Sequence, residues 1–271
     1  MEIFRYSVPS YLRINEEKTV KRIINFIRNY IKESGVAGVV LGLSGGSDSS
    51  VTAALAVRAL GPSRVNALIM PDKESSPRSV SDAEHVARLL GIRYVRIDIT
   101  PIVSSVLGAF GDDYSKAPKI PKGNVKARAR MILLYYMANK ENLIVLGTSD
   151  KSEWLLGYFT KWGDAAADVY PLINLYKSQV RLLGDYLELP EDIIWKPSTP
   201  DLWVKHRASE ELGADYDVID PILYHYVELS LSPKDIANKL NINLGLVKSI
   251  VSRVSLYEHK RKMIKGPEPV Y

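Results

Sequence analysis

A short polar stretch between two apolar segments holds the residues best suited to chemistry in this chain. It runs Ser44-Gly45-Gly46-Ser47-Asp48-Ser49, after the apolar run 36–43 and before the helix-forming stretch 51–60. This order predicts a strand, a tight loop and a helix. A loop rich in glycine and serine at a helix start lets backbone N–H groups approach an anion, and the helix dipole adds to the attraction. We therefore expect phosphate as the ligand of this loop.

Asp48 adds a second requirement to that site. A carboxylate inside a phosphate-binding loop repels the phosphate unless a divalent cation lies between them, so the loop predicts magnesium together with a polyphosphate. The Gly-Lys-Ser/Thr ending of a Walker A loop is missing, so this loop is of another kind. The plainer alternative is that Asp48 and Ser49 only cap the helix. Two glycines among four polar residues favour the phosphate interpretation.

The motif SGGSDS after an apolar run resembles the PP-loop of the ATP pyrophosphatases, enzymes that split ATP between the α and β phosphates and adenylate a substrate. The loop alone leaves open NAD synthetases, GMP synthetase ATPase domains, argininosuccinate-type synthetases and tRNA-thiolating enzymes. The stretch 147–171, GTSDKSEWLLGYFTKWGDAAADVYP, resembles the signature of NAD synthetases and is far more specific because it is long and irregular. Further similarities lie at 124–128, 175–178, 200–203 and 259–261.

The resemblance implies roles for individual residues. The residues that would contact ATP are Gly42, Leu43, Ser44, Gly45, Gly46, Ser47, Asp48, Ser49, Thr148, Lys177 and Thr199. Asp48 and Glu153 would bind magnesium, and Asp48 and Lys177 would be catalytic, because cations stabilise charge on the α-phosphate and on the pyrophosphate leaving group. The residues that would bind deamido-NAD are Arg128, Lys161, Asp168, His259 and Lys260. Outside this context Lys161 would be a solvated lysine, and His259 a partner of a helix dipole.

The composition is that of an ordinary globular chain. Its 271 residues are 46% hydrophobic and 25% charged, enough for one sizeable α/β core or two small ones. No apolar run approaches the roughly 18–20 residues of a membrane span, and the start lacks a signal-peptide core, so we expect a cytoplasmic protein. The net charge of +5 is spread along the sequence and suits a nucleotide. The lack of cysteine excludes disulfides, thiolate metal sites and a cysteine nucleophile.

The apolar pattern predicts strands at 36–43, 64–71, 92–99 and 143–148, alternating with helices at 15–34, 51–60, 79–90 and 125–141. This alternation favours one α/β domain over 1–271, with an open, mainly parallel sheet and helices on both faces. The resemblance to the PP-loop enzymes implies a fold similar to that of the adenine-nucleotide α-hydrolases. We expect 111–123 to be a mobile surface loop, and 152–170 and 197–216 to be irregular. Further helices are predicted at 176–187, 218–229, 233–240 and 244–261, so that about 217–261 form a helical C-terminal extension.

Two other functions compete with this interpretation. Residues 232–258 resemble a helix-turn-helix, but its second helix opens with Leu244-Gly245-Leu246-Val247, which cannot read base edges, so we expect no nucleic-acid partner. tRNA thiolation normally uses a cysteine persulfide or a cluster held by cysteines, and this chain has none.

The resemblance therefore implies an ammonia-dependent ligase of the NAD synthetase family. ATP would adenylate deamido-NAD with release of pyrophosphate, and ammonia would then give NAD and AMP. A chain without cysteine has no glutaminase nucleophile of its own, so we expect free ammonia as the donor, with a separate glutaminase subunit as the alternative. Family resemblance, a long substrate and the apolar stripes of 20–31 and 218–229, which lack evident cover within the chain, predict a homodimer.

Overall fold

The computed structural model describes residues 8–262, and its centre is a four-stranded parallel sheet. The strands are β1 Gly38–Gly42, β2 Val65–Ile69, β3 Arg93–Arg96 and β4 Leu143–Val145, in the order β3-β2-β1-β4. All three neighbouring pairs are parallel. The two central strands consist almost wholly of buried residues, as a sheet covered on both faces requires. The predicted open parallel sheet is confirmed.

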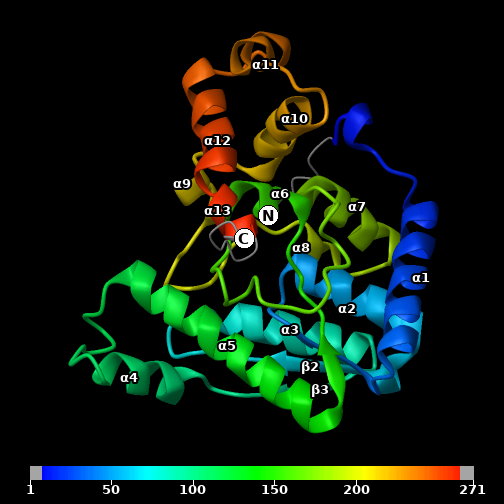
Figure 1. Ribbon diagram of the computed structural model, residues 1–271, viewed down its shortest axis with the longest axis vertical. Coiled ribbons are helices and arrows are strands. Elements are labelled where there is room, and N and C mark those ends of the chain that lie inside the picture. The colour runs from blue at the N-terminus through cyan, green and yellow to red at the C-terminus, as the bar shows by residue number, and fades with distance from the viewer. Residues whose placement is uncertain (1–7, 263–271) are drawn as a thin grey trace, which may run out of the picture.

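Helices cover the two faces of the sheet because successive residues of a strand point to opposite sides. Val39 and Leu41 belong to a hydrophobic cluster with α1 Glu16–Ser34, α2 Ser47–Leu60, α3 Pro77–Leu89 and α7 Lys177–Tyr186. Val40, between them, packs in a second cluster with α4 Thr100–Gly108 and α5 Lys119–Glu141. Figure 1 shows α4 and α5 together on one side of the molecule and α1 and α2 on the other.

The remaining elements follow β4. They are α6 Lys151–Leu156, α8 Glu191–Ile194, α9 Ala208–Leu212, α10 Tyr216–Val227, α11 Pro233–Leu240, α12 Leu244–Leu256 and α13 Glu258–Arg261, and two short 3₁₀ helices lie earlier, at Ser10–Leu12 and Pro62–Arg64. The helices α10 to α13 pack together beyond the carboxyl edge of the sheet (Figure 1). Val247 and Ile250 of the helix-turn-helix-like pair are buried in this packing. Within residues 8–262, no helix is both long and apolar enough to cross a membrane.

The apolar stripes of α1 and α10 are both covered within the chain. Asn15 caps α1 by accepting from the Lys18 N–H at 2.8 Å, and Gly35 ends it in the left-handed conformation. The side chains of Ile23, Ile27 and their neighbours in the stripe are buried because α1 packs on α2 and α7. α10 is likewise buried among α6, α7, α11 and α12. The expectation that these stripes lack cover within the chain is therefore wrong.

The segment 111–123 differs from the expectation as well. α5 begins at Lys119, so the last part of the predicted loop is helical. The side chains of Lys122 and Lys126 are 4% and 0% exposed. A sequence pattern treats lysines as solvated, and it therefore places the start of this helix too late. Four short helices were also absent from the prediction, because such helices gain their stability from tertiary packing; they are α4, α6, α8 and α9. α6 and α9 lie in the stretches 152–170 and 197–216 that were expected to be irregular, so this expectation is wrong at these two places.

Candidate active site

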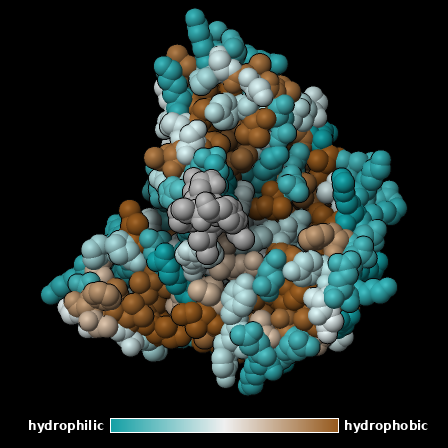
Figure 2. Space-filling view, in the orientation of Figure 1, coloured by the Kyte–Doolittle hydropathy of each residue, from teal (hydrophilic) through white to brown (hydrophobic). Residues whose placement is uncertain are grey.

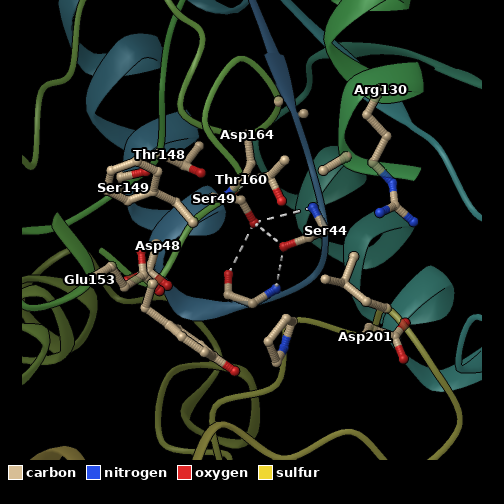
Figure 3. Close-up of a pocket in the computed structure, with 18 of the residues that line it drawn as sticks. Ser44, Asp48, Ser49, Arg130, Thr148, Ser149, Glu153, Thr160, Asp164 and Asp201 are labelled. Carbon is tan, nitrogen blue, oxygen red and sulfur yellow. Dashed lines mark hydrogen bonds between the residues drawn. The ribbon is translucent and has the colours of Figure 1, made fainter. Parts of the chain in front are cut away.

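The loop between β1 and α2 has a conformation fixed by its own residues. Gly45 has φ +77°, and a Cβ there would lie 2.4 Å from the backbone oxygen of Ser79, so only glycine fits. The Ser49 hydroxyl accepts from the Ser44 N–H at 3.2 Å and donates to the Gly46 carbonyl at 3.2 Å (Figure 3). The loop therefore presents the start of α2 in one fixed geometry, ready for an anion.

The loop opens into a cleft of about 560 Å³ at the carboxyl edge of the sheet. Its walls come from the end of β2, from α5, from residues 146–149 and 157–167, and from the segment 196–203. Open α/β sheets bind ligands at this edge, and the volume suits a nucleotide-sized ligand.

A fully buried lysine lies at one end of this cleft. The Nζ atom of Lys177 is 2.6 Å from Asp48 Oδ2, 3.0 Å from Asp150 Oδ2 and 2.8 Å from Glu153 Oε1. Three carboxylates thus contact one ammonium group. We refer to Lys177, Asp48, Asp150 and Glu153 as the Lys177 cluster. An ammonium group fixed beside a loop at a helix start can stabilise negative charge on a bound anion.

Asp220, a fully buried carboxylate on α10, fixes the helix starts that present this cluster. Its Oδ1 accepts from the Ser152 hydroxyl at 2.6 Å, and its Oδ2 accepts from the Ser178 N–H at 2.7 Å. The Ser152 hydroxyl in turn accepts from the Lys177 N–H at 3.0 Å. The first turns of α6 and α7 are therefore held together by a group from the C-terminal helices.

Burial and charge set the protonation of the cluster. Burial raises the pKa of Asp150 well above its ordinary value and raises the pKa of Glu153 to about 7, and the neighbouring carboxylates add to both effects. Burial alone would lower the pKa of Lys177, but the three carboxylates outweigh it and the pKa is raised. Lys177 is therefore charged near neutral pH. Among the described residues 8–262, no group of three or more Asp, Glu, His or Cys side chains is arranged as a metal site. In the Lys177 cluster the three carboxylates surround the ammonium group of Lys177.

Most of the predicted ATP-binding residues line the cleft. They are Gly42, Leu43, Ser44, Gly46, Ser47, Asp48, Ser49, Thr148, Lys177 and Thr199. Glu153, which was predicted to bind magnesium, lines the cleft as well. Gly45 instead faces α3. Lys260 of the predicted dinucleotide set also lines the cleft, and its Nζ donates to the carbonyls of Gly157 and Phe159 at 2.8 Å each.

Four other predicted substrate residues do not line the cleft of this chain. Arg128 donates to the Lys161 carbonyl at 3.2 Å, and Lys161 donates to the His259 carbonyl at 3.1 Å, so these three form one group on the surface. Asp168 accepts from the Val145 N–H at 2.8 Å and from the Tyr135 hydroxyl at 3.1 Å. These bonds place Asp168 beside the end of β4.

Arg130 is a cleft residue that the sequence interpretation missed. It lies two positions after Arg128 on α5, which is about 200° around a helix, so the two side chains point in opposite directions. Its Nε donates to the Met70 carbonyl at 3.0 Å, and its guanidinium extends into the cleft (Figure 3). The helical period of α5 could have identified Arg130 as a cleft residue. Ala127, Met131 and Leu134 lie on the side of α5 that faces the cleft, and position 130 lies on the same side.

A glycine- and serine-rich loop lies between the first strand of a parallel sheet and a helix start, and it opens on a cleft with a buried lysine. This arrangement is typical of nucleotide-using α/β enzymes. The sequence model of the NAD synthase family matches residues 19–264, and the chain belongs to that family. It is 46% identical to the NH(3)-dependent NAD(+) synthetase of Hyperthermus butylicus over 267 residues, which is 98% of this chain and 95% of that protein.

Two solved structures share the whole fold. One is an NMN synthetase from Francisella tularensis, with a TM-score of 0.80 and 32% identity, covering 94% of this chain and 99% of the other. The other is an NH3-dependent NAD synthetase from Campylobacter jejuni, solved with a nitrate ion, with a TM-score of 0.78 and 32% identity over 94% of this chain and all of the other. The predicted fold class is confirmed by both.

Proposed function

We propose that the chain is an ammonia-dependent NAD synthetase, an amide-forming ligase that uses ATP. In the first step a carboxylate oxygen of deamido-NAD attacks the α-phosphorus of ATP, the bond to the bridging oxygen breaks, and pyrophosphate leaves. In the second step ammonia attacks the acyl carbon, AMP leaves with the electrons of the carbon–oxygen bond, and nitrogen loses a proton. The observation that carries the proposal is the near-complete match to an NH(3)-dependent synthetase, joined to a buried lysine beside a phosphate-binding loop.

The residues of the cleft have distinct parts in the first step. The N–H groups at the start of α2 would bind the phosphates, and Thr148 and Thr199 would contact the rest of ATP. Lys177 would stabilise the charge on the α-phosphate and on the departing pyrophosphate, since its ammonium is already fixed and desolvated. The cleft walls would shield the acyl-adenylate from water.

We also propose that Asp48 and Glu153 bind magnesium together with the ATP phosphates. Carboxylate oxygens are the ligands that this cation prefers. Asp48 Oδ1 is buried without a hydrogen-bond partner, and three carboxylates face one ammonium, so the donor set fits a divalent cation. The cation, when bound, supplies charge neutralisation at the phosphates.

For the dinucleotide, we propose that Arg130 and Lys260, which both line the cleft, would bind its anionic groups. Arg128, Lys161, Asp168 and His259 would bind the part that extends beyond the cleft. A second copy of the chain would complete these outer walls. We therefore propose a homodimer with substrate near the interface.

A hydrophobic face on α4 and α5 supports the dimer. Four exposed apolar side chains lie there: Val106 on α4, Phe110 just after α4, and Ile132 and Tyr136 on α5, which are 40%, 83%, 56% and 65% exposed. Figure 2 shows hydrophobic surface where these helices lie. Such contiguous apolar surface is typical of interfaces. Light scattering at assay concentration should give the mass of two chains, and an active monomer would contradict the proposal.

The assay that tests the function combines the purified protein with ATP, magnesium, ammonium and deamido-NAD, and measures NAD and pyrophosphate. Nicotinate mononucleotide is run in parallel, because one structural relative is an NMN synthetase. Preference for the dinucleotide is expected; amidation of the mononucleotide alone would overturn the assignment.

Free ammonia is expected as the donor, because the chain has no cysteine nucleophile. Only unprotonated ammonia has a lone pair for attack, so at fixed total ammonium the rate should climb with pH until the enzyme itself titrates. NAD formed from ammonia-free glutamine by this chain alone would refute this, whereas glutamine activity that needs cell extract would indicate a glutaminase partner.

A further inference from the structure

A buried ion-pair cluster lies directly behind one wall of the cleft. It consists of Asp72, Glu74, Tyr114, Lys122 and Lys126, none of which lines the cleft. Lys126 Nζ is 2.5 Å from Asp72 Oδ2 and 2.8 Å from Glu74 Oε2, and its side chain is fully buried. Lys122 Nζ is 2.7 Å from Glu74 Oε1. We call this group the Lys126 cluster.

Each carboxylate oxygen of the Lys126 cluster has a donor. Asp72 Oδ1 accepts from the Ser75 hydroxyl at 2.7 Å, and Tyr114 donates its hydroxyl to Asp72 Oδ2. Burial alone would raise the pKa of Asp72 and of Glu74, but the hydrogen bonds from the lysines, and for Asp72 also from the hydroxyls, outweigh it and lower both pKa values. Two carboxylates therefore meet two ammonium groups, and each carboxylate oxygen accepts a bond from a donor of this chain. A cluster with this balance suits a structural role.

Lys126 also forms a hydrogen bond with the segment 197–207, which is far away in the sequence. Its Nζ donates to the carbonyl oxygen of Leu202 at 2.7 Å. Beside this contact, the Asp201 carboxylate accepts from the Ser76 N–H at 3.1 Å. The bonds of Lys122 run to Glu74 and to the Tyr114 carbonyl instead. Lys126 therefore joins α5, the loop 70–76 after β2 and the segment 197–207, and parts of all three line the cleft.

The segment 197–207 depends on such contacts for its conformation. It contains no helix or strand, and Asp201 and Lys205 have positive φ values of 51° and 59°. Non-glycine residues keep such conformations when the surroundings hold them. A charge-assisted hydrogen bond from a buried ammonium is one of the stronger contacts available for this.

We propose that Lys126 is a positioning residue for the ATP-binding walls of the cleft. Through Asp72, Glu74 and the Leu202 carbonyl it holds the loop 70–76 and the segment 197–207 in their binding conformation before the ligand arrives. The proposal rests on the proposed function only for the identity of the ligand. Preorganised walls spare the ligand the cost of ordering them, so losing Lys126 should weaken ATP binding more than it slows chemistry.

The first test is Lys126→Met, measured by hydrogen exchange in the full chain without ATP. Informative amides are those of Ser76, which donates to Asp201, and of His206 and Ala208, which donate to the Trp203 and Ser198 carbonyls at 3.1 Å each. We expect about tenfold or faster exchange there than in the wild type, relative to the buried amides of β1. The KM for ATP should rise by a similar factor, with kcat changed by less than about threefold.

Lys122→Met is the matched control, because Lys122 is also buried and shares Glu74 but has no bond to 197–207. It should lower stability without changing the KM for ATP or the exchange of His206 and Ala208. The double variant Asp72→Asn/Lys126→Met removes both charges, so it should fold even where Lys126→Met does not, and keep the raised KM and fast exchange.

The proposal is overturned if Lys126→Met and Lys122→Met behave alike in exchange and KM, or if the double variant returns to wild-type values. The exchange measurement uses no substrate. Fast exchange confined to Lys126→Met in a protein that makes no NAD would therefore refute the proposed function and leave the role of Lys126 standing.

Discussion

Two fully buried lysines, Lys126 and Lys177, are surrounded by carboxylates in different ways. In the Lys126 cluster two carboxylates face two ammonium groups, each carboxylate oxygen has a donor, and the pKa values of Asp72 and Glu74 are lowered. In the Lys177 cluster three carboxylates face one ammonium, Asp48 Oδ1 has no partner, and the pKa of Glu153 is raised.

This difference in charge balance agrees with the two proposed roles, a structural role for the Lys126 cluster and a role in ligand binding for the Lys177 cluster. A neutral, fully bonded cluster behind the cleft wall has no capacity left for a ligand. In the Lys177 cluster the carboxylates outnumber the ammonium group and repel one another, which raises the pKa values of Asp150 and Glu153. The proposed magnesium ion would relieve this repulsion when it binds with the ATP phosphates. Charge balance and location, rather than burial, distinguish the two lysines.

The largest expected effect concerns the excess carboxylates. Asp48→Asn or Glu153→Gln should nearly abolish turnover and weaken its magnesium dependence, because each removes a proposed cation ligand. Folding should be little affected, since removing a carboxylate relieves repulsion in the free protein. Steady-state assays over a magnesium series, with thermal unfolding as the control, test this; wild-type turnover at limiting magnesium would contradict the metal assignment.

Lys177→Ala should lower kcat by on the order of 10²–10³, the usual loss when one preorganised donor is removed. The loss should fall on adenylation, because the charge that Lys177 stabilises develops there. Preformed adenylated intermediate mixed with ammonia should still give NAD at the wild-type rate. If it does not, Lys177 acts in the second step.

The two clusters should also differ in stability. Lys126→Met leaves Asp72 as an uncompensated buried charge and should lower the free energy of unfolding by about 3–5 kcal/mol. Denaturant titration measures this loss, and the double variant Asp72→Asn/Lys126→Met should recover most of it. Equal destabilisation by Lys126→Met and Glu153→Gln would remove the distinction between the clusters.

The smallest effect is a pH dependence of opposite sign in the two clusters. Glu153 has its pKa raised from 4.5 to about 7, so the folded state binds more protons in that window and stability falls as pH rises through it. Asp72 and Glu74 have lowered pKa values, so their contribution is present above their unfolded pKa values and is lost as pH falls through the folded ones.

We expect the free energy of unfolding without ligand, measured from about pH 4 to pH 8, to fall with pH more steeply in the wild type than in Glu153→Gln. The difference in slope should be on the order of 1 kcal/mol per pH unit between pH 4.5 and 7. Parallel curves would mean that Glu153 does not carry a raised pKa.

The sequence by itself determined the elements whose signals lie within a few residues. The strand, loop and helix around Ser44–Ser49, the helix predicted at 15–34, and the bounds of α11 at Pro233 and Leu240 agree with the structure. Caps, glycines and apolar periods act locally, so they can be read locally. The long motif at 147–171 also gave the family, which the comparisons confirm.

Tertiary structure alone decided which charges are buried. Lys126 meets Glu74 across 52 positions, and Lys177 meets Asp48 across 129. No local pattern marks these lysines as buried, because a lysine loses its water only where distant carboxylates replace it. The same reason explains why the start of α5 at Lys119–Gly123 was predicted to be a loop. The cover of the apolar α1 stripe comes from α2 and α7, and contacts between elements that are separated in the sequence leave no local pattern.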